Sequence, residues 1–100
     1  MKYSYNYEKL EHDIYTTIRR YKKANIGDRI REYYPLGSHI AIVLAESRFS
    51  LNDLPLDVLL NDTDCETFNQ VVKLFQSFYK KPIDIYKDKF YVYVLGRVKD

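Results

Sequence analysis

Residues 49–97 decide the fold, and they read FSLNDLPLDVLL (49–60), NDTD (61–64), CETFNQVVKLFQSFYKK (65–81) and PIDIYKDKFYVYVLGR (82–97). In the first segment, Ser50 followed by Asp53 is typical of a helix that begins near 51–53, and Pro55 is tolerated in a first helical turn. Residues 61–64 then predict a tight turn before a second, longer helix.

The second helix is expected over 64–80. Thr63 and Glu66 have the spacing of a capping box, in which each residue satisfies a free backbone N–H at the start of a helix. Pro82 prevents the helix from continuing. One face of this helix is apolar over nearly half of its circumference, and it consists of Phe68, Val71, Val72, Leu74, Phe75, Phe78 and Tyr79.

The last segment predicts a β-hairpin. Residues 83–86 and 90–95 are the expected strands, and Lys87, Asp88 and Lys89 form the tip between them. Phe90, Val92 and Val94 share one face of the last strand.

This order of two helices and a hairpin resembles a winged helix-turn-helix domain, a fold used mostly to bind DNA and sometimes to bind protein. The resemblance covers about half of the chain and depends on element order. The fold class it implies is α+β: a small winged-helix-like core over 38–97, preceded by an additional helix.

That additional helix is predicted over 7–24, where apolar residues recur at steps of three and four positions. They are Leu10, Ile14, Thr17, Ile18 and Tyr21. Asn25 and Gly27 supply a stop. Before it, Tyr3, Tyr5 and Tyr7 alternate as in a strand, but seven residues do not establish one. Residues 28–34 are expected to add a short helical turn.

Residues 38–46, SHIAIVLAE, leave two interpretations open. A helix capped by Ser38 suits the winged-helix comparison and is favoured narrowly, whereas the β-branched content suits a strand buried on both faces. The strand interpretation predicts a different architecture, in which helices pack on a three-stranded antiparallel sheet.

Length and composition fit one domain over residues 1–100. The chain has 100 residues, 46% of them hydrophobic, which is enough for a single core. Its longest apolar run is too short to span a membrane, and MKYSYNYEKLEHD lacks the apolar stretch of a signal peptide. A single cysteine, Cys65, cannot form an internal disulfide. We therefore expect a cytoplasmic protein without membrane contact.

The resemblance places DNA-contacting residues on the longer helix and on the hairpin tip. Amide side chains can bond adenine, and lysine can reach guanine or phosphate. Basic residues near 19–23 could add phosphate contacts. The expected DNA-binding residues are Thr67, Asn69, Gln70, Lys73, Lys87, Lys89, Arg19 and Lys23. The implied function is a small transcriptional regulator that binds double-stranded DNA, with a homodimer expected because short DNA readers usually need two half-sites.

Charge patterning also favours an alternative, a protein-binding or inhibitor module of the kind found in viruses and mobile elements. Residues 19–31 hold six basic residues against one acidic residue, whereas 50–70 hold five acidic residues and no base. Such a chain can present an acidic face to a basic partner. The interface residues expected in this case are Asp57, Asp62, Asp64, Glu66, Tyr91 and Tyr93.

No catalytic or metal-binding pattern is present, so neither enzyme activity nor a cofactor is expected. Asp62, Asp64 and Glu66 alternate like an EF-hand loop, but the sixth position lacks glycine and Lys73 occupies the twelfth, where a glutamate is needed. His12 and His39 have no zinc spacing with Cys65. Cys65 is expected to be a buried thiol.

Overall fold

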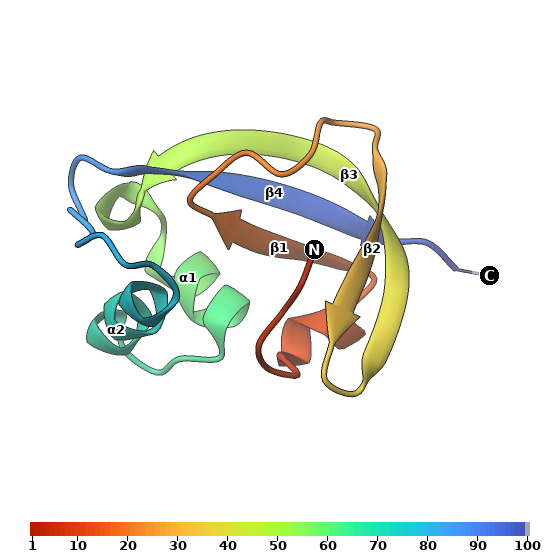
Figure 1. Cartoon of the computed structure of the whole chain (residues 1–100), viewed down its shortest axis with the longest axis horizontal. Coiled ribbons are helices and arrows are strands. Elements are labelled where there is room, and N and C mark those ends of the chain that lie inside the picture. The colour runs from red at the N-terminus through yellow and green to blue at the C-terminus, as the bar shows by residue number, and fades with distance from the viewer. Residues whose placement is uncertain (100) are drawn as a thin grey trace.

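The computed structural model describes residues 1–99, which contain four strands, two α-helices and two short 3₁₀ turns (Figure 1). In chain order these are η1 (Glu8–Glu11), β1 (Ile14–Arg19), β2 (Arg29–Tyr34), β3 (Gly37–Ser50), η2 (Leu51–Asp53), α1 (Leu56–Thr63), α2 (Phe68–Phe78) and β4 (Lys89–Arg97). The strands form one antiparallel sheet in the order β1–β4–β3–β2. The sheet is curled into a half-barrel, with α1 and α2 beside one end (Figure 1). No helix of residues 1–99 has the length and apolar character needed to cross a membrane.

Strand β4 is the centre of this sheet. It pairs with β1 from Ile14↔Gly96 to Arg19↔Tyr91, and with β3 from Ala41↔Arg97 to Ser50↔Lys89. A β-bulge between Val43 and Ala45 shifts the register along β3, and bulges of this kind bend a strand and increase its twist. The turn Pro35–Leu36 joins β2 to β3.

The expected winged helix-turn-helix fold is therefore wrong. The N-terminal helix predicted over 7–24 is absent: its residues form η1, strand β1 and part of the link to β2. In the segment 28–34, residues 29–34 form β2 instead of a helical turn, and 38–46 lie inside the 14-residue strand β3 instead of a helix. The strand interpretation of 38–46 is confirmed, although the strand is buried on one face and not on both. The alternative architecture built on it fails, because the sheet has four strands and not three.

The misassigned N-terminal helix has a physical explanation in two-sided burial. Tyr15 and Thr17 on one face of β1 are buried, and Ile18 on the other face is buried too. A strand covered on both sides loses the simple alternation of apolar and polar residues, and its apolar positions then resemble helical spacing.

The expected hairpin over 83–86 and 90–95 is also wrong. Only its second strand exists, within β4, and this strand pairs with β1 and β3. Residues around 84 form a tight turn, because the Asp84 carboxylate accepts hydrogen bonds from the N–H groups of Tyr86 and Lys87, at 2.9 and 3.1 Å. This Asx-type turn replaces the strand.

Both helices begin later than expected. Helix α1 begins at Leu56, after Pro55 as N-cap, while residues 51–53 form only η2. Helix α2 spans 68–78 and not 64–80, and its N-cap is Thr67, whose hydroxyl accepts from the Gln70 N–H at 3.2 Å. Thr63 is the last residue of α1, where its hydroxyl donates to the Leu59 carbonyl.

Two apolar clusters lie on opposite faces of the sheet, since alternate residues of β4 enter different clusters. Tyr93 and Leu95 belong to the N-terminal core, which also contains Tyr3, Tyr7, Leu10, Tyr15, Ala24, Ala41 and Val43. Phe90 and Val92 belong to the helix-side core, which also contains Ile18, Leu51, Leu54, Leu59, Val71 and Phe75.

A polar network is buried beside the N-terminal core. The fully buried Glu32 carboxylate accepts from the hydroxyls of Tyr3 and Tyr15, at 2.6 and 3.1 Å, and lies 3.0 Å from the Met1 ammonium. The Tyr15 hydroxyl also lies 2.7 Å from Nε2 of His39. Because a buried charge is tolerated only when it is paired and hydrogen-bonded, this network holds residues 1–3 against β1 and β2.

The position of the α2 cap gives a first prediction. Thr67→Ala should lower the free energy of unfolding by about 1 kcal/mol, because the Gln70 N–H loses its acceptor. Glu66→Ala is the matched control, since the exposed Glu66 contributes its backbone N–H and not its side chain to the cap. Urea denaturation checks both variants. A loss with Glu66→Ala and none with Thr67→Ala would contradict this cap.

Acid should destabilise the fold through His39. Burial lowers the pKa of His39 from its ordinary value of 6.5, and Arg97 lowers it further, while Glu32 opposes the shift. Below about pH 6.5, the unfolded chain therefore binds more protons at His39 than the folded chain does. The contribution of neutral His39 to stability is complete above about pH 6.5 and is lost as the pH falls through the folded-state pKa of His39. The melting temperature should fall between about pH 7 and about pH 5.

The control for this pH dependence is a pair of glutamine variants. His39→Gln should reduce the fall in melting temperature, whereas His12→Gln, at an exposed position, should retain it. The same pH dependence in all three proteins would show that His39 is not responsible.

Candidate nucleic-acid interface

A groove of about 240 Å³ lies where the N-terminal segment, the end of β1 and the end of α2 meet. We call it the basic–aromatic groove, and its lining consists of Lys2, Tyr3, Ser4, Tyr7, Arg19, Tyr21, Lys23, Phe78 and Tyr79. Three of these residues are cationic and none is acidic. The groove therefore combines positive charge with aromatic surface.

Tyr79 fixes the aromatic part of the groove. Its hydroxyl accepts a hydrogen bond from the Arg20 N–H at 3.2 Å, and its ring packs on Phe90 of the helix-side core at 6.2 Å between centroids. The rings of Tyr21 and Phe78 both lie edge-to-face against Tyr79, at 6.3 and 6.5 Å. Tyr21 is 58% exposed and Phe78 39% exposed. Two exposed rings are thus held on a ring that is anchored to the core.

The cations of the groove have no acidic partner. Lys2, Arg19 and Lys23 form no ion pair with any carboxylate of residues 1–99. Arg19 is held against the Tyr3 ring, with 4.7 Å between its guanidinium carbon and the ring centroid, and it donates to the Lys2 carbonyl at 3.2 Å. Its Nε is buried and has no hydrogen-bond partner among the described residues.

Neighbouring cations, in contrast, do have acidic partners. Arg20 pairs with Asp88 at 3.2 Å, and Lys22 lies 3.5 Å from Glu46. These two residues are therefore partly neutralised, whereas the three cations that line the groove are not.

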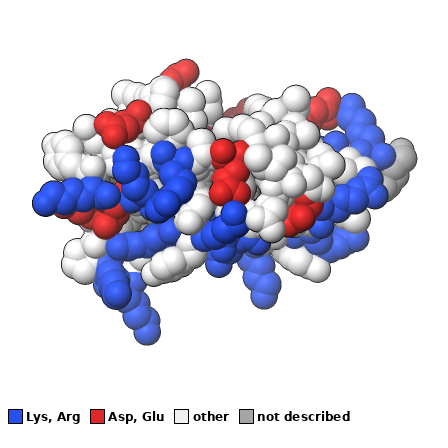
Figure 2. All heavy atoms as spheres, turned by 90° about the horizontal axis from the view of Figure 1, so that it is seen from above, with Lys and Arg blue, Asp and Glu red and all other residues white. Residues whose placement is uncertain are grey.

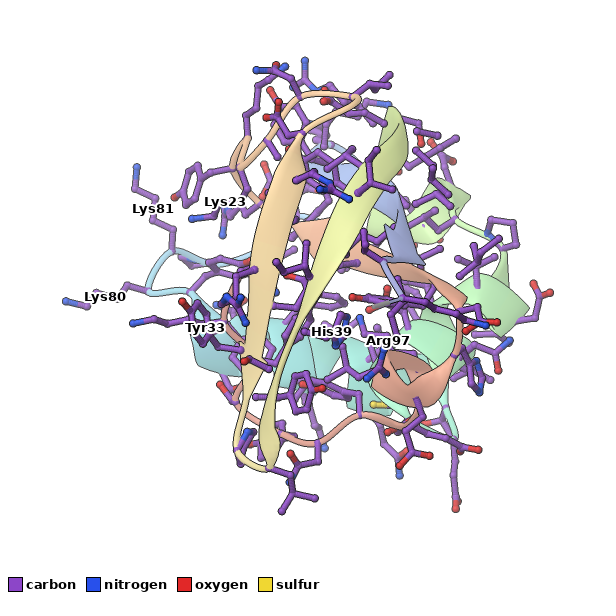
Figure 3. All side chains as sticks on the ribbon, turned by 90° about the vertical axis from the view of Figure 1, so that its right-hand side faces the viewer. Lys23, Tyr33, His39, Lys80, Lys81 and Arg97 are labelled. Atoms are coloured by element: carbon purple, nitrogen blue, oxygen red, sulfur yellow. The ribbon has the colours of Figure 1, made fainter. Side chains whose placement is uncertain are left out.

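Lys80 and Lys81 extend this positive surface. They follow Phe78 and Tyr79 directly, and they form no ion pair with a described carboxylate. The Lys81 carbonyl accepts from Arg20 and from Gln76, at 3.1 and 3.0 Å, which fixes the backbone here. Lys23, Lys80 and Lys81 project from the same side of the molecule (Figure 3). Viewed from above, Lys and Arg side chains gather along one long edge (Figure 2).

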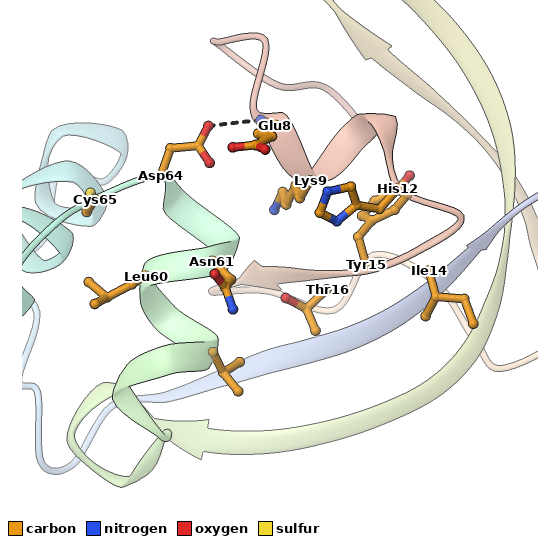
Figure 4. Close-up of a pocket in the computed structure, with 11 residues that line it drawn as sticks. Glu8, Lys9, His12, Ile14, Tyr15, Thr16, Leu60, Asn61, Asp64 and Cys65 are labelled. Carbon is orange, nitrogen blue, oxygen red and sulfur yellow. Dashed lines mark hydrogen bonds between the residues drawn. The ribbon is translucent and has the colours of Figure 1, made fainter.

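A larger cavity, of about 550 Å³, lies between η1, β1 and α1 (Figure 4). The Lys9 ammonium at its edge is buried and donates to the Asp62 carboxylate at 2.9 Å, and that carboxylate also accepts from the Thr16 hydroxyl at 2.7 Å. Burial lowers the pKa of Lys9, and Asp62 partly offsets this effect. Asp64 accepts from the Glu8 N–H. Lys9, Asp62 and Thr16 are therefore engaged with one another, while the side chains of His12 and Asn61 also line the cavity.

This cavity also lacks a metal site. Within residues 1–99, no three His, Cys, Asp or Glu side chains are placed to hold a metal ion. Cys65 is a free, half-buried thiol at its edge.

Two of the residues expected to bind DNA, Arg19 and Lys23, lie in the basic–aromatic groove. The others lie elsewhere. Thr67 and Gln70 form the α2 cap, in which the Gln70 side chain accepts from the Glu66 N–H at 2.8 Å. The remaining residues are exposed on α2, in the 84–88 turn and at the start of β4, and they are Asn69, Lys73, Lys87 and Lys89.

The residues expected to form the alternative protein interface do not share one surface, because some of them are buried and others are exposed. Asp62 and Tyr93 are buried, and the Tyr93 hydroxyl accepts from the Lys23 N–H at 2.9 Å. Asp64 is the C-cap of α1, with a φ of 58°. Tyr91 packs under Arg48 at 4.9 Å. Only Asp57 and Glu66 are exposed without such contacts among the described residues, so the set does not form one acidic face.

Sequence reasoning missed most of the groove. The omitted lining residues are Lys2, Tyr3, Ser4, Tyr7, Tyr21, Phe78 and Tyr79, and the adjacent Lys80 and Lys81 were omitted too. The available signal was that RRYKK (19–23) and FYKK (78–81) both place aromatic residues beside lysines. Tyr21, Phe78 and Tyr79 were assigned to apolar helix faces, and this assignment concealed the exposure of Tyr21 and Phe78.

The buried ion pair gives a prediction about the acidic segment. Asp62→Asn should lower the free energy of unfolding by about 3–5 kcal/mol, because the buried Lys9 ammonium loses its carboxylate. Asp57→Asn, at an exposed position, should change stability little. The double variant Lys9→Met, Asp62→Leu should lose less than Asp62→Asn. Urea denaturation distinguishes these outcomes, and equal effects of Asp57→Asn and Asp62→Asn would refute the role of the pair.

Comparison with known proteins adds one relative. "Uncharacterized protein MJ0364" of Methanocaldococcus jannaschii is 30% identical over 83 residues, which cover 78% of this chain and 71% of the relative. No protein-family model matches the chain. No solved structure matches it either. The name of the relative states no ligand or activity.

Proposed function

The chain belongs to the same family as this M. jannaschii protein, and we propose that it binds nucleic acid through the basic–aromatic groove. The observation that carries the proposal is a groove lined by Lys2, Arg19 and Lys23 without any carboxylate, although the whole chain has a formal net charge of only +2. Such a concentration of unpaired cations matches the phosphate backbone, which supplies most of the affinity of non-specific nucleic-acid binding.

The local chemistry favours phosphate over other anions of similar charge. Arg19 is held by the Tyr3 ring and the Lys2 carbonyl, so its position is set before a ligand arrives. Arginine suits phosphate oxygens because its donors form a rigid, planar fork. Lys23, Lys80 and Lys81 project from one side of the molecule and add flexible charges that can follow a polymer backbone (Figure 3). Aromatic rings between the cations suit a ligand that also has flat apolar surfaces.

The proposal does not use helix α2 as a recognition helix. Its N-terminal end is flanked by Asp64 and Glu66, which repel phosphate, and the polar side chains of Thr67 and Gln70 are engaged in the cap. The groove uses the other end of α2, where Phe78 and Tyr79 are followed by two lysines.

The test is the salt dependence of binding to a fluorescent oligonucleotide, measured by anisotropy. The affinity should fall with salt, with a log–log slope of about −0.7 per phosphate contact on a single strand or about −0.9 on a duplex. Lys2→Ala, Lys23→Ala as a double variant should weaken binding and make the slope shallower, because two phosphate contacts of the groove are lost.

The matched control removes two lysines outside the groove. Lys73→Ala, Lys87→Ala changes the net charge by the same amount but should leave the slope nearly unchanged. If both double variants weaken binding equally, net charge and not the groove determines affinity. If the unmodified protein does not bind at low salt, the proposed function is wrong.

A further inference from the structure

We infer that the basic–aromatic groove accepts an unpaired base, so that the ligand is a single-stranded nucleic acid bound with little preference for sequence. This inference rests on the proposed function and specifies the class of nucleic acid. It follows from the exposure of the rings, the size of the groove and the kinds of polar side chain that line it.

The exposed rings are the first argument. Tyr21 and Phe78 present free aromatic surface, while Tyr79 between them is held by the Arg20 N–H and by Phe90. In a duplex each base face is covered by its neighbours, so an aromatic side chain can stack only on a base that has left the helix or was never paired. Exposed rings beside phosphate-binding cations therefore match a single strand better than a duplex.

The size of the groove is the second argument. Its volume of about 240 Å³ is below the roughly 300–1,000 Å³ of typical small-molecule sites. The groove can therefore hold one flat group while the rest of the ligand remains outside. A polymer with one base inserted, and with its phosphates on the surrounding lysines, fits this geometry.

The shape of the molecule supplies the third argument. A protein that reads duplex DNA inserts a helix or a two-stranded ribbon into the major groove. Here the positive charge surrounds a depression between three chain segments, and α2 contributes only its C-terminal end. A flexible strand can bend into such a depression, whereas a rigid duplex cannot.

The low sequence preference follows from the polar groups of the lining. Recognition of a base edge needs free hydrogen-bonding side chains, and amides are the most common readers of adenine. The groove contains no Asn or Gln. The Tyr3 hydroxyl donates to Glu32, and the Tyr79 hydroxyl accepts from Arg20. The other hydroxyls of the lining, on Ser4, Tyr7 and Tyr21, can each donate or accept, so they do not select one base edge. Stacking remains as the main interaction with the base, and every base has a face that can stack.

The experiment compares ligands that differ in one property at a time. The probes are fluorescent oligonucleotides of about 12 units, within the roughly 4–16 nucleotides that one OB fold covers. They are oligo-dT, oligo-rU, an abasic strand with the same phosphates and no bases, and a duplex, with polyglutamate as a polyanion without phosphates. Oligo-dT or oligo-rU should bind about fivefold or more tightly than the abasic strand, because a stacked base strengthens binding by at least this factor.

Variants of one exposed ring connect this preference to the groove. Tyr21→Ala should remove most of the difference between oligo-dT and the abasic strand without changing the salt slope, while Tyr21→Phe should retain the difference. Tyr86→Ala is the matched control, because Tyr86 is also highly exposed, at 67%, and lies outside the groove lining.

The outcomes separate the two proposals. No binding of any oligonucleotide refutes the proposed function itself. Binding of the abasic strand or the duplex as tightly as both oligo-dT and oligo-rU overturns the single-strand inference but leaves nucleic-acid binding intact. Equal affinity for polyglutamate shows a general surface for acidic partners and also overturns the inference.

Discussion

The ion pair between Lys9 and Asp62 is the interaction on which the placement of η1 against α1 depends. It joins η1 to α1, and the Thr16 hydroxyl adds β1 to the same carboxylate. An unpaired charge at this depth would be costly, so the three elements are held in one relative position. The Lys9 ammonium also lies 5.2 and 5.4 Å from the ring centroids of Tyr3 and Tyr7, which line the basic–aromatic groove. Through these two rings, the buried ion pair supports one wall of the groove.

The groove illustrates how a small domain can separate stability from binding. Its walls are fixed by groups that do not face a ligand: Glu32 holds Tyr3, and Phe90 supports Tyr79. The groups that remain free are the exposed rings and the unpaired lysines. Changes in Tyr21, Lys80 or Lys81 can therefore alter ligand choice without disturbing the core, because all three lie at the surface.

The sequence predicted the position of some elements correctly, but it predicted the wrong pairing partners for the strands. The strand at 90–95 and two helices between 51 and 80 exist, because Pro55, Pro82 and the apolar face of α2 act over short distances. The sheet was missed because its register pairs residues far apart, such as Ile14 with Gly96. The burial of both faces of β1 also obscured its period, whereas in β3 the buried His39, Ala41 and Val43 alternate with exposed residues that are apolar too, such as Ile40 and Leu44. In the candidate site, Arg19 and Lys23 could be recognised from local charge, but the placement of Phe78, Lys2 and Tyr21 in the lining of one groove depends on tertiary structure.

The position of β4 in the chain has a consequence for how the protein folds. This strand occupies residues 89–97, yet it lies between β1 and β3, and β1 pairs with no other strand of the sheet. About 70 residues separate β1 from β4, so during synthesis β1 has no pairing partner until β4 has been made. Strands β2 and β3, in contrast, can form their hairpin as soon as both have been made. Contacts of such long sequence separation slow folding, because the chain loses entropy before the contacts form. The apolar side chains of β1 remain uncovered in that interval, which makes the nascent chain dependent on rapid completion of its last strand.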